Sequence, residues 1–194
     1  MSGRWMAAVV MVAALVGSGC SVQEKKSSNG NEDVKIETPL GGMKVKTNDS
    51  VVVSDIGIAA YPGATVVKQD KDNGAADVDM SFGGFHLGVK AVSYLTPDSQ
   101  EKVLAFYRKE LSRYGDVIEC KGVTVVGKPT KTSDGLTCEN DNHISVRDKA
   151  GSSETELKTG SKSHQRIVAL EPEQGGTKIG LVLLDLPKDK KESN

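Results

Sequence analysis

The sequence predicts an α+β fold, namely a mainly antiparallel sheet with one long helix packed on a face, preceded by a short N-terminal hairpin. Apolar residues alternate with polar ones in most segments, which is the period of a half-buried strand. One segment, from Thr96 to Gly115, repeats at the helical period instead. The order is strands, then this helix, then more strands, and such segregation is typical of α+β proteins.

The chain begins with a short apolar leader that ends at a cysteine. Arg4 precedes an apolar run over residues 5–16, and three small residues, 17–19, precede Cys20. A run this short cannot span a bilayer, which needs roughly 20 apolar residues, so residues 1–19 are predicted to be a signal peptide. The segment resembles a bacterial lipoprotein signal peptide, and this resemblance implies lipid attachment at Cys20. Gly17 stands where such leaders carry Leu, and an ordinary secretory cleavage site is the alternative.

The remaining chain divides by composition. Residues 20–33 contain a single aliphatic side chain, so we expect a flexible, lipid-anchored tether. Residues 34–48 alternate around a turn at Pro39–Gly42 and predict a short β-hairpin. Residues 49–187 form the predicted globular α+β domain, and residues 188–194 a disordered tail.

The domain is predicted from local patterns along the chain. Lys71–Gly74 contains Asn-Gly and predicts a tight turn after a strand over Ala64–Gln69. Leu181–Leu184 is apolar at every position, which suits a central strand. Asn140–Ser163 is polar, and we expect an exposed excursion. Further strands are expected at residues 78–82, 87–95, 117–120, 122–126, 136–138, 166–171 and 177–186.

The helix has both start and stop signals. Thr96 or Asp98 is expected to cap it, Asp98 and Glu101 have capping-box spacing, and Gly115 ends it. The side chains expected to pack against the sheet recur at helical spacing; they are Val103, Phe106, Tyr107, Leu111 and Tyr114.

Of the three cysteines, one follows the leader and two lie in the predicted domain. With lipid on Cys20, the pair Cys120 and Cys138 remains, and an oxidising compartment favours a disulfide between them. Each follows an aliphatic residue by two positions, so on strands both sulfurs would share a face with Ile118 and Leu136. Two buried free thiols are the alternative.

Short motifs also carry a resemblance. Tyr61-Pro-Gly-Ala64 follows Asp55-Ile-Gly-Ile58, and a Thr96-Pro-Asp-Ser99 cap leads into a helix with Phe106-Tyr107. Over roughly Asp55–Leu186 the chain resembles a group of uncharacterised bacterial envelope lipoproteins. The resemblance implies fold and location and brings no catalytic residue. The Tyr-Pro-Gly-Ala element itself predicts a turn that delivers Tyr61 to the core.

Residue chemistry gives no catalytic site, metal site or cofactor. His86, His143 and His164 lack the spacing of a zinc motif. Asp70, Asp72, Asp77 and Asp79 surround the Asn-Gly turn but fail the EF-hand pattern, so a solvated hairpin is expected. With 25 basic and 26 acidic residues, the charge balance argues against a nucleic-acid partner.

These observations favour a lipid-anchored protein of the bacterial cell envelope. If the cell is Gram-negative, Ser21 after the cysteine favours the outer membrane, facing the periplasm. The leading hypothesis is a non-catalytic binding or adaptor module whose partners are the membrane, through the N-terminal lipid, and another envelope protein. The alternatives are a structural or assembly factor that docks on an envelope protein and, third, a hydrolase.

Overall fold

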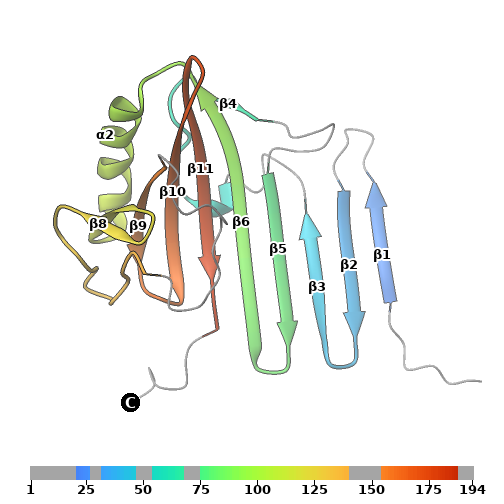
Figure 1. The fold of residues 1–194 in the computed structure, drawn as a ribbon. Coiled ribbons are helices and arrows are strands. Elements are labelled where there is room, and N and C mark those ends of the chain that lie inside the picture. The colour runs from blue at the N-terminus through green and yellow to red at the C-terminus, as the bar shows by residue number, and fades with distance from the viewer. Residues whose placement is uncertain (1–20, 27–31, 47–53, 68–74, 140–153, 188–194) are drawn as a thin grey trace, which may run out of the picture.

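The structure is a computed structural model, and it describes residues 21–26, 32–46, 54–67, 75–139 and 154–187. Cys20, the predicted leader, the Asn-Gly turn, His143 and the predicted tail lie outside these ranges. The described chain forms one antiparallel sheet of eleven strands with one long helix, which confirms the predicted fold class (Figure 1).

The sheet order is β1-β2-β3-β5-β6-β11-β10-β9-β7-β8, and β4 pairs with β6. The strand bounds are β1 Ser21–Lys26, β2 Glu32–Thr38, β3 Gly41–Lys46, β4 Thr65–Val66, β5 Ala75–Phe82, β6 Phe85–Thr96, β7 Val117–Lys121, β8 Thr124–Val126, β9 Thr155–Gly160, β10 His164–Glu173 and β11 Gly176–Asp185. As predicted, β11 is central, with β6 and β10 as its neighbours, and all four residues 181–184 are buried.

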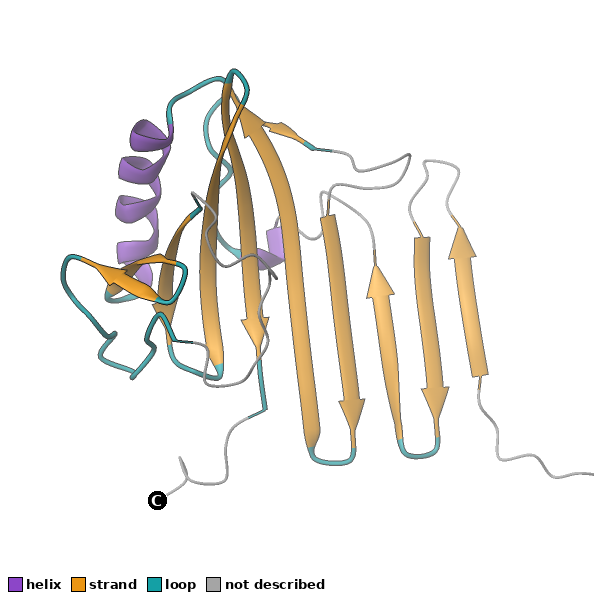
Figure 2. Cartoon of the chain, viewed as in Figure 1, coloured by secondary structure: helices purple, strands orange, loops and turns teal. Residues whose placement is uncertain are grey.

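The main core lies between the sheet and helix α2, Gln100–Leu111. Successive side chains of a strand point to opposite faces, and we call the face under α2 the helix face and the other the open face. The registers align Val92, Leu181 and Val168 in one cross-strand row on the helix face. The helix buries three side chains against this face; they are Val103, Tyr107 and Leu111, each 0% exposed. Figure 2 shows α2 against the β9–β10 end of the sheet.

The helix begins differently from its sequence prediction. Its N-cap is Ser99, whose side chain makes no capping hydrogen bond. The Asp98 carboxylate instead accepts a hydrogen bond from the Tyr61 hydroxyl at 2.7 Å and pairs with Lys102 at 2.9 Å. The predicted capping role of Asp98 is therefore wrong, because Tyr61 and Lys102 take its carboxylate. The Thr96 hydroxyl accepts the Asp98 N–H at 3.4 Å, one residue before the N-cap, so it does not cap the helix either. A 3₁₀ turn, Ser112–Tyr114, follows α2, and Gly115 ends it with φ of 129°.

The Tyr-Pro-Gly-Ala element forms the predicted turn. The Ala64 N–H donates to the Tyr61 carbonyl at 3.0 Å, and Gly63 adopts a positive φ of 76°. Tyr61 is consequently buried, and its ring meets Phe106 edge-on with the centroids 5.1 Å apart. This turn therefore joins the helix to the chain segment between β3 and β4.

The predicted tether is partly strand. Ser21–Lys26 forms β1, and residues 32–33 open β2, with Val22 opposite Ile36. Low apolar content did not exclude these strands, because an added strand satisfies its backbone groups through the ladder. The β2–β3 hairpin is present, with its turn at residues 39–40. Because β3 also pairs with β5, this hairpin continues the main sheet instead of standing apart from it.

The hairpin expected around the Asn-Gly turn does not form. Both β4 and β5 pair with β6, so neither pairs with the other. The Val67 N–H donates to the Ser93 carbonyl, and Ala75 is already the partner of Val92, the next position along β6. β4 and β5 therefore lie in line along the same side of β6, so the residues between them connect two parts of one row and not the two strands of a hairpin.

The expected exposed excursion at Asn140–Ser163 is wrong for its described part. Thr155–Gly160 forms β9, which lies between β10 and β7, and Leu157 and Thr159 are fully buried. Lys158 is only 3% exposed. The polar composition of this segment hid an interior strand, because threonine is a good strand former and the buried Lys158 pairs with Glu156 of the same strand.

Candidate functional site

The first candidate is a part of the sheet that the long helix α2 does not cover. We define the wing as strands β1, β2, β3 and β5 together with residues 85–90 of β6. Figure 1 shows these strands extending away from α2 as a nearly flat array. The two faces of the wing differ sharply in chemistry.

The open face of the wing is apolar. The registers place Val34 opposite Val45, Val45 opposite Val78, and Val78 opposite Val89, so these side chains share one face across four strands. A second row lies beside it on the same face and consists of Ile36, Met43, Met80 and Leu87. All eight side chains are partly exposed. Such a contiguous apolar area marks a contact surface more often than isolated exposed residues do.

The helix face of the wing is charged. Asp77 lies between Lys46, at 4.0 Å, and Lys90, at 3.6 Å, and Lys90 also contacts Asp55 at 2.9 Å. The hydrogen bond and charge of Lys90 lower the pKa of the Asp55 carboxyl. Burial acts to lower the pKa of Lys90, but Asp55 and Asp77 outweigh it and raise that pKa. These pairings occupy the Asp77 carboxylate with two lysines, whereas Asp70 and Asp72 lie outside the described residues.

Two histidines that are distant in sequence lie on this same face. Ser81 Oγ is 3.3 Å from His86 Nδ1, and His86 Nε2 is 3.6 Å from Asp79. His164 pairs with Asp185, which stands opposite Gly88 in the register. Sequence spacing could not reveal this grouping, because only strand pairing creates it.

The histidine grouping is a surface cluster. The side chains of His86 and Asp79 are 56% and 49% exposed, so water competes for each of their hydrogen bonds. An activated serine nucleophile needs its base held and oriented by a third group, and solvent weakens that arrangement here. Within the described ranges, no three His, Cys, Asp or Glu side chains gather in a group that could hold a metal ion.

A cleft of about 410 Å³ lies between the end of α2 and strands β7 and β8. Arg108 and Glu119 form an ion pair in its lining, and Asp116 and Lys128 add charge of both signs. The opposed charges compensate one another, and the cleft is open to solvent. The cleft therefore offers polar contacts, but its lining does not gather charged side chains of a single sign.

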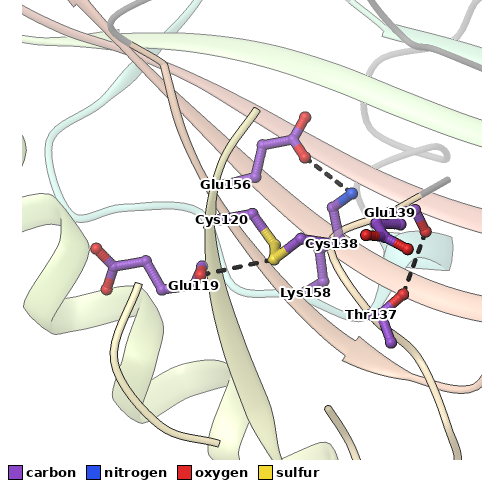
Figure 3. Close-up of a disulfide and its surroundings, with 7 residues drawn as sticks. All are labelled: Glu119, Cys120, Thr137, Cys138, Glu139, Glu156 and Lys158. Carbon is purple, nitrogen blue, oxygen red and sulfur yellow. Dashed lines mark hydrogen bonds and ion pairs between the residues drawn. A yellow bond between two sulfur atoms is a disulfide. The ribbon is translucent and has the colours of Figure 1, made fainter. Parts of the chain in front are cut away.

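The predicted disulfide is present. Cys120 and Cys138 are bonded, and their Cα atoms are 5.6 Å apart (Figure 3). Their sulfurs share a buried cluster with Ile118 and Leu136, as expected from the two-residue spacing. Residues 136–138 are not a strand, however; Gly135 alone makes an isolated bridge with the chain after β9. Beside the disulfide, Lys158 Nζ lies 3.0 Å from Glu156.

Comparisons with known proteins add no family. No protein-family model, curated protein or solved structure matches the chain. In the described part of the chain, no helix combines the length and the apolar character that crossing a membrane requires.

Proposed function

We propose that the chain is a lipid-anchored protein of the bacterial cell envelope that acts as a non-catalytic binding or adaptor module. The observation that carries this proposal is the wing, whose open face is apolar and whose other face is charged. A sheet with one apolar face normally buries it against another layer. The layer that the chain itself supplies, α2, lies on the opposite face and at the other end of the sheet.

The size of the open face indicates the kind of occupant. Four strands at about 4.8 Å spacing and about five residues of each strand give roughly 300 Å². Stable protein dimers bury about 800 Å² on each partner, so a second copy would be held weakly. A partner confined to the same membrane needs less contact area, because anchoring raises the effective concentration of both proteins. The proposed occupant is therefore an apolar surface of another envelope protein.

Location and acylation form the first part of the test. The mature chain should begin at acylated Cys20, and Cys20→Ala should move the protein from the membrane fraction to the soluble fraction. Intact mass of the native protein measures the modification directly. An unmodified chain that begins at Cys20 would show ordinary secretion instead.

Contact with a partner is tested by site-specific photocrosslinking in the intact envelope. A photoreactive residue at Val45, on the open face, should give one discrete adduct, and the same residue at Lys44, on the helix face, should not. Val78→Asp should remove the Val45 adduct, whereas Asp79→Asn on the charged face should preserve it. Equal adducts from both faces, or an adduct of the chain with itself, would contradict the adaptor role.

A docking or assembly factor remains the second candidate, and β1 favours it. This strand ends the sheet order, so its outer edge has no partner strand among the described residues. An open edge can accept a strand from another protein. Crosslinks from Gln23 of β1 in the absence of crosslinks from Val45 would favour this candidate. No observation in the structure favours the hydrolase.

A further inference from the structure

One end of the wing gathers three chain features. We call it the turn end. Ser21, the first residue of β1, is the register partner of Glu37, next to the β2–β3 turn. That turn presents Leu40, and the β5–β6 turn presents Phe82 and Phe85. Figure 1 shows both turns at the same end of the wing, where β1 also starts.

Exposed apolar side chains concentrate at this end. The described residues hold seven exposed large hydrophobic side chains, and four of them belong to the turn end. Leu40 is 82% exposed, Val22 67%, Phe85 45% and Phe82 44%. The other three exposed large hydrophobic side chains, Leu95, Val123 and Val126, lie elsewhere.

The two turns are fixed to each other. The Gly83 N–H donates to the Leu40 carbonyl at 3.2 Å, and Gly83 adopts a positive φ of 58°. A Cβ on Gly41 would lie 2.8 Å from the Phe82 ring and 2.0 Å from the Ser81 carbonyl oxygen. Glycine is therefore required for Phe82 to lie across the neighbouring strand. The turn end is a joined, preformed surface rather than two independent loops.

The wing is also polarised along its strands. At the end away from the turns, Asp33, Lys46, Asp77 and Lys90 succeed one another across four strands in register. The charges of this row compensate one another through the ion pairs of Asp77 with Lys46 and Lys90, whereas the turn end exposes apolar side chains. The wing is thus amphipathic from end to end as well as from face to face.

The turn end adjoins the predicted lipid attachment site. Cys20 directly precedes Ser21, so no spacer separates the cysteine from the start of β1. We propose that the turn end inserts Leu40, Phe82 and Phe85 into the surface of the lipid bilayer, beside the acyl chains on Cys20. The position of the lipid rests on the proposed function. Four exposed side chains are far too few for a stable protein interface, but apolar side chains next to a covalent lipid add to the buried apolar area that holds a protein at a bilayer surface.

The test uses tryptophan reporters in the mature chain, residues 20–194, with Cys20→Ala, so that neither the apolar leader nor acylation plays a part. Trp5, the single tryptophan of the sequence, belongs to the leader and is absent from this chain. Leu40→Trp reports on the turn end. Val123→Trp is the matched control, because Val123 is 69% exposed and lies between β7 and β8, beyond the helix-covered end. The probe is vesicles of phosphatidylethanolamine and phosphatidylglycerol, with and without brominated acyl chains.

Leu40→Trp emission should shift to the blue on adding vesicles and be quenched by brominated lipid, whereas Val123→Trp emission should not change. Phe85→Ser, added to Leu40→Trp, should weaken vesicle binding about tenfold, as expected for one large apolar side chain. Absence of quenching at Leu40, or equal quenching at both positions, would overturn the proposal. A blue shift without vesicles, accompanied by a doubled mass in solution, would show contact between copies and would also overturn it. Since these variants lack the lipid, their outcome is independent of whether native Cys20 is acylated.

Discussion

At the residue scale, the disulfide is the feature with the clearest energetic role. It joins β7 to the segment after β8 across 18 positions and lies in its own buried cluster, separate from the main core. Closing a loop of this length stabilises the folded state by about 3 kcal/mol in the chain-entropy model. The bond therefore holds a part of the open face that α2 does not cover.

Cys138→Ser should lower the free energy of unfolding by about 2–4 kcal/mol. Chemical denaturation of wild type and variant under non-reducing conditions measures this difference. Thr137→Ser, one position away and on a half-buried side chain, is the control. Non-reducing peptide mapping of the wild type should recover the linked peptides, and equal stability of the two proteins would show that the bond has no stabilising role.

The pairing of these cysteines could be predicted from the sequence. With Cys20 assigned to the lipid, only two cysteines remain, and an oxidising compartment favours a disulfide between them. Their setting could not be predicted. Residues 136–138 are of types that favour strands, but they do not pair with a neighbouring strand. The segment is attached instead by the bridge from Gly135 to Ser161 and by the disulfide. The cluster of Ser81, His86 and Asp79 follows from the two-residue turn Gly83-Gly84, which sets the β5–β6 register. The approach of His164 to this cluster depends instead on the pairing of β6 with β11, which no local spacing encodes.

At the element scale, the start of α2 shows how a tertiary contact replaces a local one. The apolar stripe of the helix could be predicted, because its spacing alone determines which side faces the sheet. The cap could not, since Asp98 lies at a junction of three elements: its carboxylate accepts from Tyr61, and its carbonyl accepts from Thr177 at 2.9 Å. Burial raises the pKa of Tyr107 within the same region, well above its usual range.

This junction predicts a pH dependence of stability. Lys102 and the Tyr61 hydroxyl lower the pKa of the Asp98 carboxyl, through their hydrogen bonds to it. A folded-state pKa below the unfolded value of about 3.9 stabilises the fold above that value, and the contribution disappears as pH falls through the folded pKa. Asp98→Asn should therefore lower Tm at neutral pH and have a smaller effect near pH 3.

Thermal melts of wild type and Asp98→Asn across this pH range measure the difference. Glu101→Gln is the control, because it removes an exposed carboxylate from the same helix turn. A Tm difference that stays constant between neutral and acidic pH would show that the Asp98 carboxylate contributes no charge-dependent stability.

At the scale of the whole molecule, the sheet has two parts with different support. Strands β9, β10 and β11 pack on α2, whereas the wing has no long helix on either face in the described part of the chain; the single helical turn at residues 54–56 meets it through the Asp55–Lys90 ion pair. The fold class could be predicted from strand alternation and one helical stripe. The extent of the wing could not, because β1 consists of polar residues and is held through its backbone pairing with β2.

Hydrogen exchange should separate the two parts. Amides of β2 and β3 should exchange faster than those of β10 and β11, because fewer buried contacts oppose local opening of the wing. Mass-spectrometric exchange on the Cys20→Ala chain measures both sets in one experiment, and the disulfide-linked strand β7 serves as an internal reference. Uniform protection across the sheet would show that the wing opens only with the whole domain.

The collinear strands β4 and β5 have a consequence for how this domain can vary. The row is paired up to Val67, opposite Ser93, and resumes at Ala75, opposite Val92. Seven residues of sequence thus connect two consecutive positions of the ladder along β6. The pairing with β6 therefore does not fix how many residues this connection contains. Adding residues there costs little loop-closure entropy and shifts neither flanking register. The position is a natural insertion point, at which relatives can differ in length and an epitope can be introduced without rebuilding the sheet.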